Sequence, residues 1–513
     1  MRATTNYRRR APVRLLASSA LAVLAGVAAG VSFAPLHLVY LLPLAVAALT
    51  LLCMSAGAGV RRGFWLGFCF GTAFMLVLLP WLLVIGWYAW IPLSVVEGLF
   101  FGLAGLATAA VRRLPWWPLW AASSWILVEA LRDRWPLGGF PWGRLGFAAE
   151  DTPLAPLFAY VGPAGVGFAM ALLGTVLAWA LLHARRHPLR AVAALVAACI
   201  VAGAAAVFPW TPPAPSDRVR VAAVQGNVPR IGLDAFTQRR VVLDNHVQAT
   251  LNLAARIDAG KAPRPDLVVW PENSSDIDPY TDPVARQEIV RAVRAVGVPL
   301  LMGAVIGERV HEPWHNRAIV WSADGVPGAY YDKIHPVPFG EYVPFRSLLA
   351  SRIPALDQIP TDMARGKRPG ILQVGPAKVG VVMCFEVAYD GLVRDLVTHG
   401  ARLIVVPTNN ATYTGTGQLA QQFAMSRLRA VETGRFVVIA STNGISGIIG
   451  PTGEVLDRAP VRTQAVLERS VGLSTARTPA VRFETWVEWG LVAVAGCAAL
   501  VGLLQRERRM GRR

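Results

Sequence analysis

Three side chains of complementary reactivity lie close to the ends of short apolar runs in the second half of the chain. Cys384 ends an apolar run that begins at Val379, and Glu272 follows the run 266–270 after a single proline. Lys333, one of only four lysines, lies in the segment 332–344, whose prolines exclude a helix. A cysteine nucleophile needs a base to remove its proton and a cation to hold the developing oxyanion. Glu272 and Lys333 can fill these roles, although by position alone Cys384 fits a structural core cysteine equally well.

The elements that must position these residues are short β-branched runs, which are typical of strands buried on both faces. They are residues 219–224, 266–270, 299–304, 318–321, 379–383, 403–407 and 436–440. Helical patterns lie between some of them, at residues 235–259, 283–296, 389–398 and 418–433. This alternation predicts a layered α/β domain, in which Glu272 and Cys384 stand at strand ends, where sites in such folds gather.

The rest of the chain is apolar enough to cross a membrane repeatedly. Of the 513 residues, 54% are hydrophobic and 16% are charged, against roughly 25% charged in soluble domains, and the mean hydropathy is +0.44. Runs of about the length of a bilayer core predict about eight spans. These are residues 15–32, 38–55, 64–85, 91–111, 116–131, 157–182, 191–207 and 486–504.

The apolar runs and a proline-rich segment divide the chain into predicted domains. A membrane domain of seven transmembrane helices is expected at residues 1–208, and a proline-rich linker at 209–217. The catalytic α/β domain is expected at 218–482. Residues 483–513 would hold the eighth transmembrane helix and a basic tail.

The net charge of +18 follows largely from arginines that flank the predicted spans. Arginine clusters precede the first span and follow the second, fourth, sixth and eighth, so all of them fall on one side of the membrane. The positive-inside rule puts that side in the cytoplasm, with both termini, and puts the catalytic domain outside. This placement argues against nucleic-acid binding as the origin of the charge, and five cysteines are too few for a disulfide framework.

The motifs around the three reactive residues resemble the Glu-Lys-Cys signature of the nitrilase superfamily. They are Trp-Pro-Glu at 270–272, Asp-Lys at 332–333 and Cys-Phe-Glu at 384–386. Together with the predicted spans and the α/β domain between the seventh and the eighth, they resemble the apolipoprotein N-acyltransferase family. Gly-Phe-Pro-Trp at 139–142 and Pro-Phe-Gly-Glu-Tyr-Val-Pro at 338–344 also look like that family.

The resemblance implies a nitrilase-like αββα sandwich for the catalytic domain and a role for each motif residue. Cys384 would be the nucleophile, Glu272 the general base, and Lys333 the group that stabilises the tetrahedral intermediate. Glu341 and Glu386 match further acidic positions that support the site. The resemblance also implies a multi-pass protein of a bacterial-type inner membrane that needs no cofactor and no metal.

The implied reaction is acyl transfer in two steps through a thioester on Cys384. The acyl chain would pass from a membrane phospholipid to the cysteine, and then to the free α-amino group of the diacylglyceryl-cysteine of a lipoprotein. The partners are therefore a phospholipid donor and a diacylated apolipoprotein acceptor, and no nucleic acid. Two departures from the family pattern bear on how these chains are held: Phe385 replaces a common Tyr, and no Trp follows Pro229 closely.

Two other functions stay open at this point. A membrane-tethered nitrilase-type amidase that hydrolyses the C–N bond of a small amide would use the same three residues with water as the acceptor. It would leave the predicted spans unexplained. A transporter or scaffold with a nitrilase-like binding domain would have no need for all three of Glu272, Lys333 and Cys384.

Two local patterns are not expected to form functional sites. His311-Glu-Pro-Trp-His315 matches the zinc pattern H-E-x-x-H, but Pro313 prevents the helix that would bring both histidines to one face. Glu129 lies in the fifth predicted span, where a carboxylate is often functional. We expect it to pair with Arg132 instead.

Overall fold

The computed structural model describes residues 2–55, 59–215, 217–229, 238–307, 313–349, 356 and 361–510. The chain forms two compact units, which are described separately. Unit 1 comprises Met1–Pro209 and Arg482–Arg513, and unit 2 comprises Trp210–Val481.

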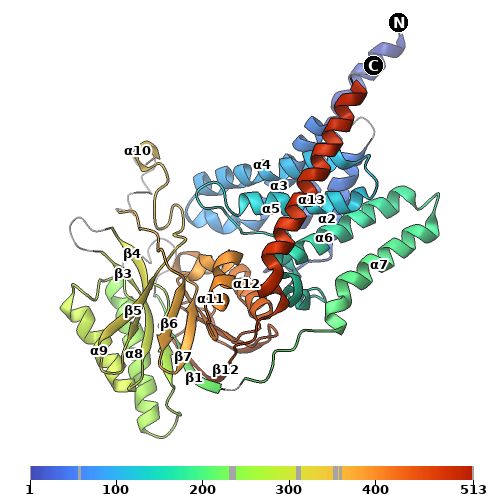
Figure 1. Ribbon diagram of the computed structural model, residues 1–513. Coiled ribbons are helices and arrows are strands. Elements are labelled where there is room, and N and C mark those ends of the chain that lie inside the picture. The colour runs from blue at the N-terminus through green and yellow to red at the C-terminus, as the bar shows by residue number, and fades with distance from the viewer. Residues whose placement is uncertain are drawn as a thin grey trace. The chain divides into compact units, whose positions relative to one another are not determined.

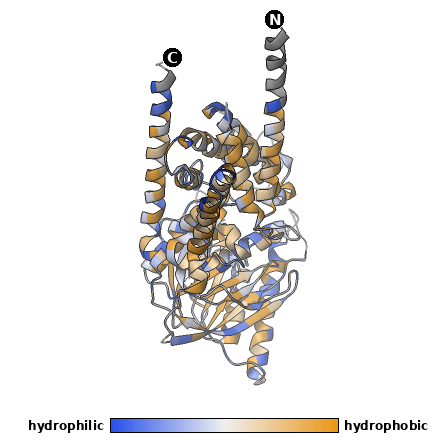
Figure 2. Ribbon diagram, turned by 90° about the vertical axis from the view of Figure 1, so that its right-hand side faces the viewer, coloured by the Kyte–Doolittle hydropathy of each residue, from blue (hydrophilic) through white to orange (hydrophobic). Residues whose placement is uncertain are grey.

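Unit 1 is built from helices that are apolar over most of their length (Figures 1 and 2). They are α1 (Arg2–Gly30), α2 (Leu41–Met54), α3 (Val60–Leu78), α4 (Trp87–Val111), α5 (Trp117–Arg132), α6 (Phe158–His183), α7 (Pro188–Val207) and α13 (Pro479–Met510). Short 3₁₀ turns lie at Pro80–Val84, Leu145–Ala149 and Ala155–Leu157.

Five of the described helical segments are long and apolar enough to cross a membrane. They are Val60–Leu78, Trp87–Val111, Ala155–His183, Pro188–Val207 and Pro479–Arg508. The apolar part of α1, Arg14–Gly30, and helix α2 are shorter, and α5 has only 16 residues. On length and composition, the described helices therefore give five spans, fewer than the predicted eight.

A buried arginine ties the loop after α5 to the helices of unit 1. The guanidinium group of Arg132 donates to Glu97 of α4 at 2.8 Å, to the Phe140 carbonyl at 2.9 Å and to the Trp142 carbonyl at 2.7 Å. Arg132 is fully buried. Arg132 thus holds the Gly-Phe-Pro-Trp segment at 139–142 through hydrogen bonds to two of the segment's backbone carbonyls.

The expected pairing of Glu129 with Arg132 is wrong. Glu129 accepts the backbone N–H of Leu145 at 2.7 Å and lies 3.6 Å from Arg144, which also lies 3.2 Å from Asp133. The sequence separation of a single helical turn favoured the local partner, but the fold supplies Arg144 from the loop beyond α5.

Unit 2 contains two six-stranded sheets, in the orders β12-β1-β2-β3-β4-β5 and β11-β10-β9-β8-β7-β6. The strands are β1 (Asp217–Gln225), β2 (Leu267–Val269), β3 (Leu300–Ile306), β4 (His315–Trp321), β5 (Pro327–Asp332), β6 (Gly370–Val374), β7 (Ala377–Val381), β8 (Leu403–Thr408), β9 (Val437–Ser441), β10 (Gly447–Ile449), β11 (Val455–Arg458) and β12 (Ala465–Leu473). In each sheet three central strands are parallel, β1-β2-β3 and β7-β8-β9, and the outer pairs are antiparallel.

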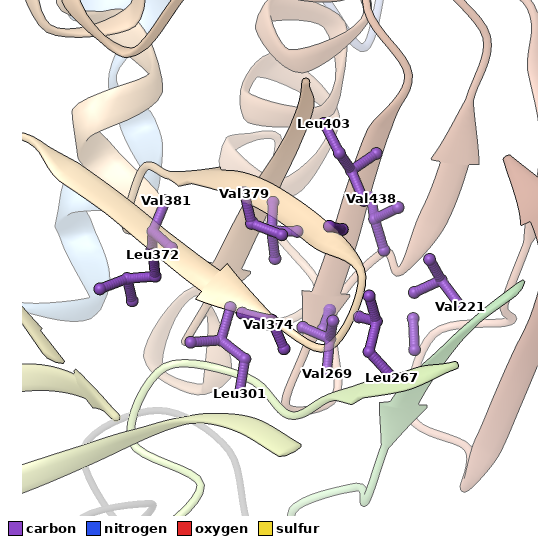
Figure 3. Close-up of a cluster of buried hydrophobic side chains, with 14 of the residues drawn as sticks. Val221, Leu267, Val269, Leu301, Leu372, Val374, Val379, Val381, Leu403 and Val438 are labelled. Atoms are coloured by element: carbon purple, nitrogen blue, oxygen red, sulfur yellow. The ribbon is translucent and has the colours of Figure 1, made fainter. Parts of the chain in front are cut away.

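The inner faces of the two sheets share one apolar core (Figure 3). Val221 lies opposite Leu267 in the first sheet, and Val379 lies opposite Leu403 in the second. Branched side chains on both inner faces exclude water from the space between the sheets, and this burial is the main force that holds them together.

Helices cover the outer face of each sheet (Figure 1). On the first sheet they are α8 (Arg239–Asp258) and α9 (Pro283–Val296), and on the second they are α11 (Asp390–Thr398) and α12 (Gln418–Thr433). The short helix α10 (Arg346–Leu349) lies between β5 and β6 in the sequence. The cap of α9 is local, because the Asp282 carboxylate accepts the N–H of Ala285 at 2.7 Å. The result is the αββα sandwich that the resemblance implied.

Candidate active site

Cys384 begins a 3₁₀ turn, Cys384–Ala388, that follows strand β7. Its φ of +50° lies in the left-handed region, which costs a non-glycine residue on the order of 1–3 kcal/mol and persists only when the surroundings enforce it. The side chain is buried. Its Sγ lies 3.7 Å from Gln422 Oε1 and 3.9 Å from the carbonyl oxygen of Asn409.

Lys333 stands between two carboxylates. Its Nζ lies 2.7 Å from Glu272 Oε1 and 2.9 Å from Glu341 Oε2, and both Lys333 and Glu272 are only 2% exposed. Burial opposes the charged ammonium group, but Glu272 and Glu341 outweigh it and raise the pKa of Lys333 well above its ordinary value. A fixed positive charge therefore stands in the site.

Glu272 is held by two further donors. Asn316 Nδ2 donates to Glu272 Oε1 at 2.8 Å and to Glu341 Oε1 at 2.5 Å, and the backbone N–H of Asn409 donates to Glu272 Oε2 at 2.9 Å. Neither asparagine was predicted from the sequence. Asn316 is a buried amide near the start of strand β4, between the partly exposed His315 and Arg317, and a polar residue in a strand is a weak signal by itself.

The electrostatics of the site keep the thiol protonated at rest. Burial first, and then the carboxylate of Glu272, raise the pKa of the Cys384 thiol, and Lys333 opposes them only in part. A thiolate therefore has to form at the moment when a base takes the proton, and the carboxylate of Glu272 lies close enough to the thiol to affect its pKa.

Glu386 joins the two segments that carry the cysteine and the lysine. Its carboxylate accepts the N–H groups of Met383 at 2.9 Å, Ile334 at 2.8 Å and His335 at 2.9 Å. The Tyr331 hydroxyl group lies 2.9 Å from both carboxylate oxygens. Burial raises the pKa of Glu386. These bonds fix the turn after β7 against the loop after β5.

The structure brings all five predicted site residues together. Four of them lie at the thiol, and the fifth, Glu386, lies against the backbone. Lys333 bonds both Glu272 and Glu341 beside the thiol of Cys384, whereas Glu386 bonds the backbone on both sides of the site. A thiol, two carboxylates and a cation lie together here, and these are the types of group that acyl transfer through a thioester requires.

Within the described residues, no group of three or more His, Cys, Asp or Glu side chains could hold a metal ion. Of the H-E-x-x-H pattern, His311 and Glu312 lie outside the described residues, and His315 begins strand β4 with its Nδ1 3.8 Å from Asp332. The segment after Pro229 that has no Trp also lies outside them.

Two family models match the chain. The apolipoprotein N-acyltransferase N-terminal domain matches residues 25–176, and the carbon-nitrogen hydrolase model matches residues 220–479. Among solved structures, an amidase from Nesterenkonia sp. is 21% identical, with a TM-score of 0.36, over 53% of this chain and 96% of that chain.

Two relatives resemble nearly the whole chain. The apolipoprotein N-acyltransferase of Mycolicibacterium smegmatis is 36% identical over 468 residues, which are 87% of this chain and 78% of the relative. The protein of the same name from Allorhizobium ampelinum is 31% identical over 484 residues, which are 88% of each chain. With the apolar helices of unit 1, these matches make the chain a multi-pass membrane protein. It belongs to the apolipoprotein N-acyltransferase family.

Proposed function

We propose that the protein transfers an acyl chain from a membrane phospholipid to the free α-amino group at the N-terminus of a diacylated lipoprotein, through a thioester on Cys384. One observation carries this proposal. A buried lysine is shared by Glu272 and Glu341 beside the thiol, so that a base and a cation flank one nucleophile. Family membership supplies the class of donor and acceptor.

In the first step, Glu272 takes the thiol proton while the sulfur of Cys384 attacks an ester carbonyl of the phospholipid. A C–S bond forms, and the ammonium group of Lys333 stabilises the negative charge on the carbonyl oxygen. The C–O bond then breaks, and the leaving glycerol oxygen takes the proton from Glu272. A lysophospholipid departs, and the acyl chain stays on sulfur.

In the second step, the neutral α-amino group of the lipoprotein attacks the thioester carbon. Glu272 takes a proton from the attacking nitrogen, a C–N bond forms and the C–S bond breaks. The sulfur regains its proton from Glu272, so the enzyme returns to its resting state. Asn316 and Glu341 hold the side chains of Glu272 and Lys333 in position through both steps.

The proposal extends to how the chain is organised. Residues 1–208 would form a membrane domain of seven transmembrane helices, 209–217 the linker, 218–482 the catalytic domain, and 483–513 the eighth helix and the basic tail. Eight crossings would leave both termini in the cytoplasm and the catalytic domain outside, in a bacterial inner membrane. The shorter apolar helices α1, α2 and α5 and the arginine clusters support this count. Labelling of single introduced cysteines with an impermeant reagent on intact cells tests it.

A product assay tests the reaction. Purified protein in detergent is mixed with phospholipid and a synthetic diacylated lipopeptide, and both lipid products are followed by mass spectrometry. We expect equal amounts of lysophospholipid and N-acylated lipopeptide from wild type, and neither from Cys384→Ala. Release of free fatty acid without any N-acylated peptide would instead indicate a hydrolase.

A further inference from the structure

Gln422 of helix α12 contacts the thiol of Cys384 and is not one of the three residues Glu272, Lys333 and Cys384. Its side chain is 3% exposed, and its Oε1 lies 3.7 Å from Sγ, which is within the range of an S–H···O hydrogen bond. The carbonyl oxygen of Asn409 lies 3.9 Å from the sulfur, and the carboxylate of Glu272 is also within hydrogen-bonding reach of the thiol. Gln422 and Asn409, the uncharged groups that contact the thiol among the described residues, both present acceptors to it.

An amide network holds the Gln422 side chain in this position. Its Oε1 accepts from Asn410 Nδ2 at 3.0 Å and from Gln418 Nε2 at 2.8 Å, and its Nε2 donates to Thr408 Oγ1 at 3.1 Å. All of these side chains are buried. A buried amide with this many bonds has a single orientation and little freedom to move.

A serine hydroxyl group extends the network that orients the amide. Ser441 Oγ accepts the N–H of Gly444 at 3.0 Å and donates to Asn410 Oδ1 at 3.1 Å. This bond turns Asn410 Nδ2 toward the oxygen of Gln422. With the amides turned over, the hydrogen of Ser441 would lose its acceptor.

We propose that Gln422 is a further catalytic residue. Its side-chain carbonyl accepts a hydrogen bond from the thiol of Cys384 in the resting enzyme and holds the sulfur in place until Glu272 takes the proton. This inference rests on the proposed role of Cys384 as the nucleophile. A carbonyl oxygen that faces sulfur favours the thiol over the thiolate. The cysteine is thereby kept in its unreactive form between turnovers.

The thiol is also faced by charged and titratable groups, and their effect has to be separated from that of Gln422. They are Glu272 after β2, Lys333 and Glu341 from the loop after β5, and Tyr413 of the turn Ala411–Tyr413. Glu386 of the cysteine's own turn acts on Lys333. Gln422 is uncharged, so replacing it leaves all of these charges in place. Its contribution can therefore be measured by itself.

The test is the rate at which iodoacetamide alkylates Cys384 in the full-length protein, measured at several pH values and assigned by peptide mass spectrometry. Gln422→Met keeps the length of the side chain but removes the acceptor. We expect alkylation to be about three- to tenfold faster than in wild type at each pH, as for a thiol pKa lower by about half a unit to one unit.

Gln225→Met is the matched control. Gln225 is a buried glutamine of β1 with three side-chain bonds, to Pro460, Thr463 and Ser446, and none of them reaches the thiol. It should lose stability but keep the wild-type alkylation rates. Unchanged or slower alkylation of Gln422→Met, or equal acceleration in the control, would overturn the inference. Because this assay needs no lipid, it is decided separately from acyl transfer, whose absence in wild type would contradict only the proposed function.

Discussion

Each unit buries a cation beside carboxylates: an arginine in unit 1 and, in the candidate active site of unit 2, a lysine. In unit 1, Arg132 pairs with Glu97 and also donates to the carbonyls of Phe140 and Trp142. In unit 2, Lys333 is a compact charge shared by two carboxylates beside a thiol. The arginine fork holds a loop through several fixed bonds, whereas the lysine places one charge where a reaction can use it.

This difference indicates which cluster supports the fold and which supports chemistry. Arg132 bonds a carboxylate and two backbone carbonyls, with no thiol among its contacts in the described residues, so changes there should act on stability. In unit 2 the lysine and the carboxylates that it bonds also lie beside Cys384, so changes there should act on rate.

Lys333→Met should abolish acyl transfer. It removes the only cation that contacts Glu272 and Glu341 among the described residues, and we expect kcat to fall by about 10³-fold or more. Lys333→Arg serves as the control, because its planar fork cannot occupy the same point between the two carboxylates. Turnover of the lipopeptide measures both, and recovery of more than a tenth of the wild-type rate by the arginine would show that geometry at this point is unimportant.

Arg132→Met should destabilise unit 1 by about 3–5 kcal/mol, because it leaves Glu97 buried without its cation. The unfolding temperature in detergent measures this loss. The matched control is Arg190→Met, since Arg190 is exposed in α7 and a surface substitution should change stability by only about 0.5 kcal/mol. A loss of turnover per folded molecule, without a change in unfolding temperature, would refute the structural role given to this cluster.

Asn316→Ala should lower kcat by about ten- to a hundredfold and leave KM almost unchanged. The amide donates to both Glu272 and Glu341, so its removal lets the base and its neighbour move apart without removing either group. Steady-state kinetics over a range of lipopeptide concentrations separate the two constants. A large rise in KM with an unchanged kcat would assign Asn316 to acceptor binding instead.

A smaller effect concerns a buried neutral group of unit 2. Burial lowers the pKa of His246 from 6.5 to about 4, so between these values the unfolded chain binds more protons than the folded one. Stability should therefore be complete above pH 6.5 and fall with pH, by on the order of 2 kcal/mol at pH 5. His246→Gln should flatten the dependence of the unfolding temperature on pH. An unchanged dependence would mean that other groups control it.

The sequence predicted the centre of each sheet better than its edges. Each of the seven predicted runs overlaps a strand, from β1 and β2 to β9. Continuous apolar runs mark strands that are covered on both faces, and this is why β5 and β12, which carry polar residues at the edges of the first sheet, were missed. Helices α9 and α12 were predicted at their observed bounds.

The candidate site was predictable where charge marked it and not where amides did. Glu272 and Cys384 stand out by residue type at the ends of apolar runs, and Lys333 stands out as one of four lysines, in a proline-rich loop. Asn316 and Gln422 do not, because an uncharged amide gives no pattern in one sequence, and its partners come from distant strands and helices. Only the folded chain shows which amides lie in the site.

The measurement that tests the central claim most directly is the intact mass of the protein after incubation with a phospholipid of defined acyl chains. We predict that wild type gains the mass of one acyl chain on Cys384 and loses it on addition of the diacylated lipopeptide. Cys384→Ala should gain none. A wild-type protein that never gains the chain, or that passes it only to water, would contradict the acyltransferase account.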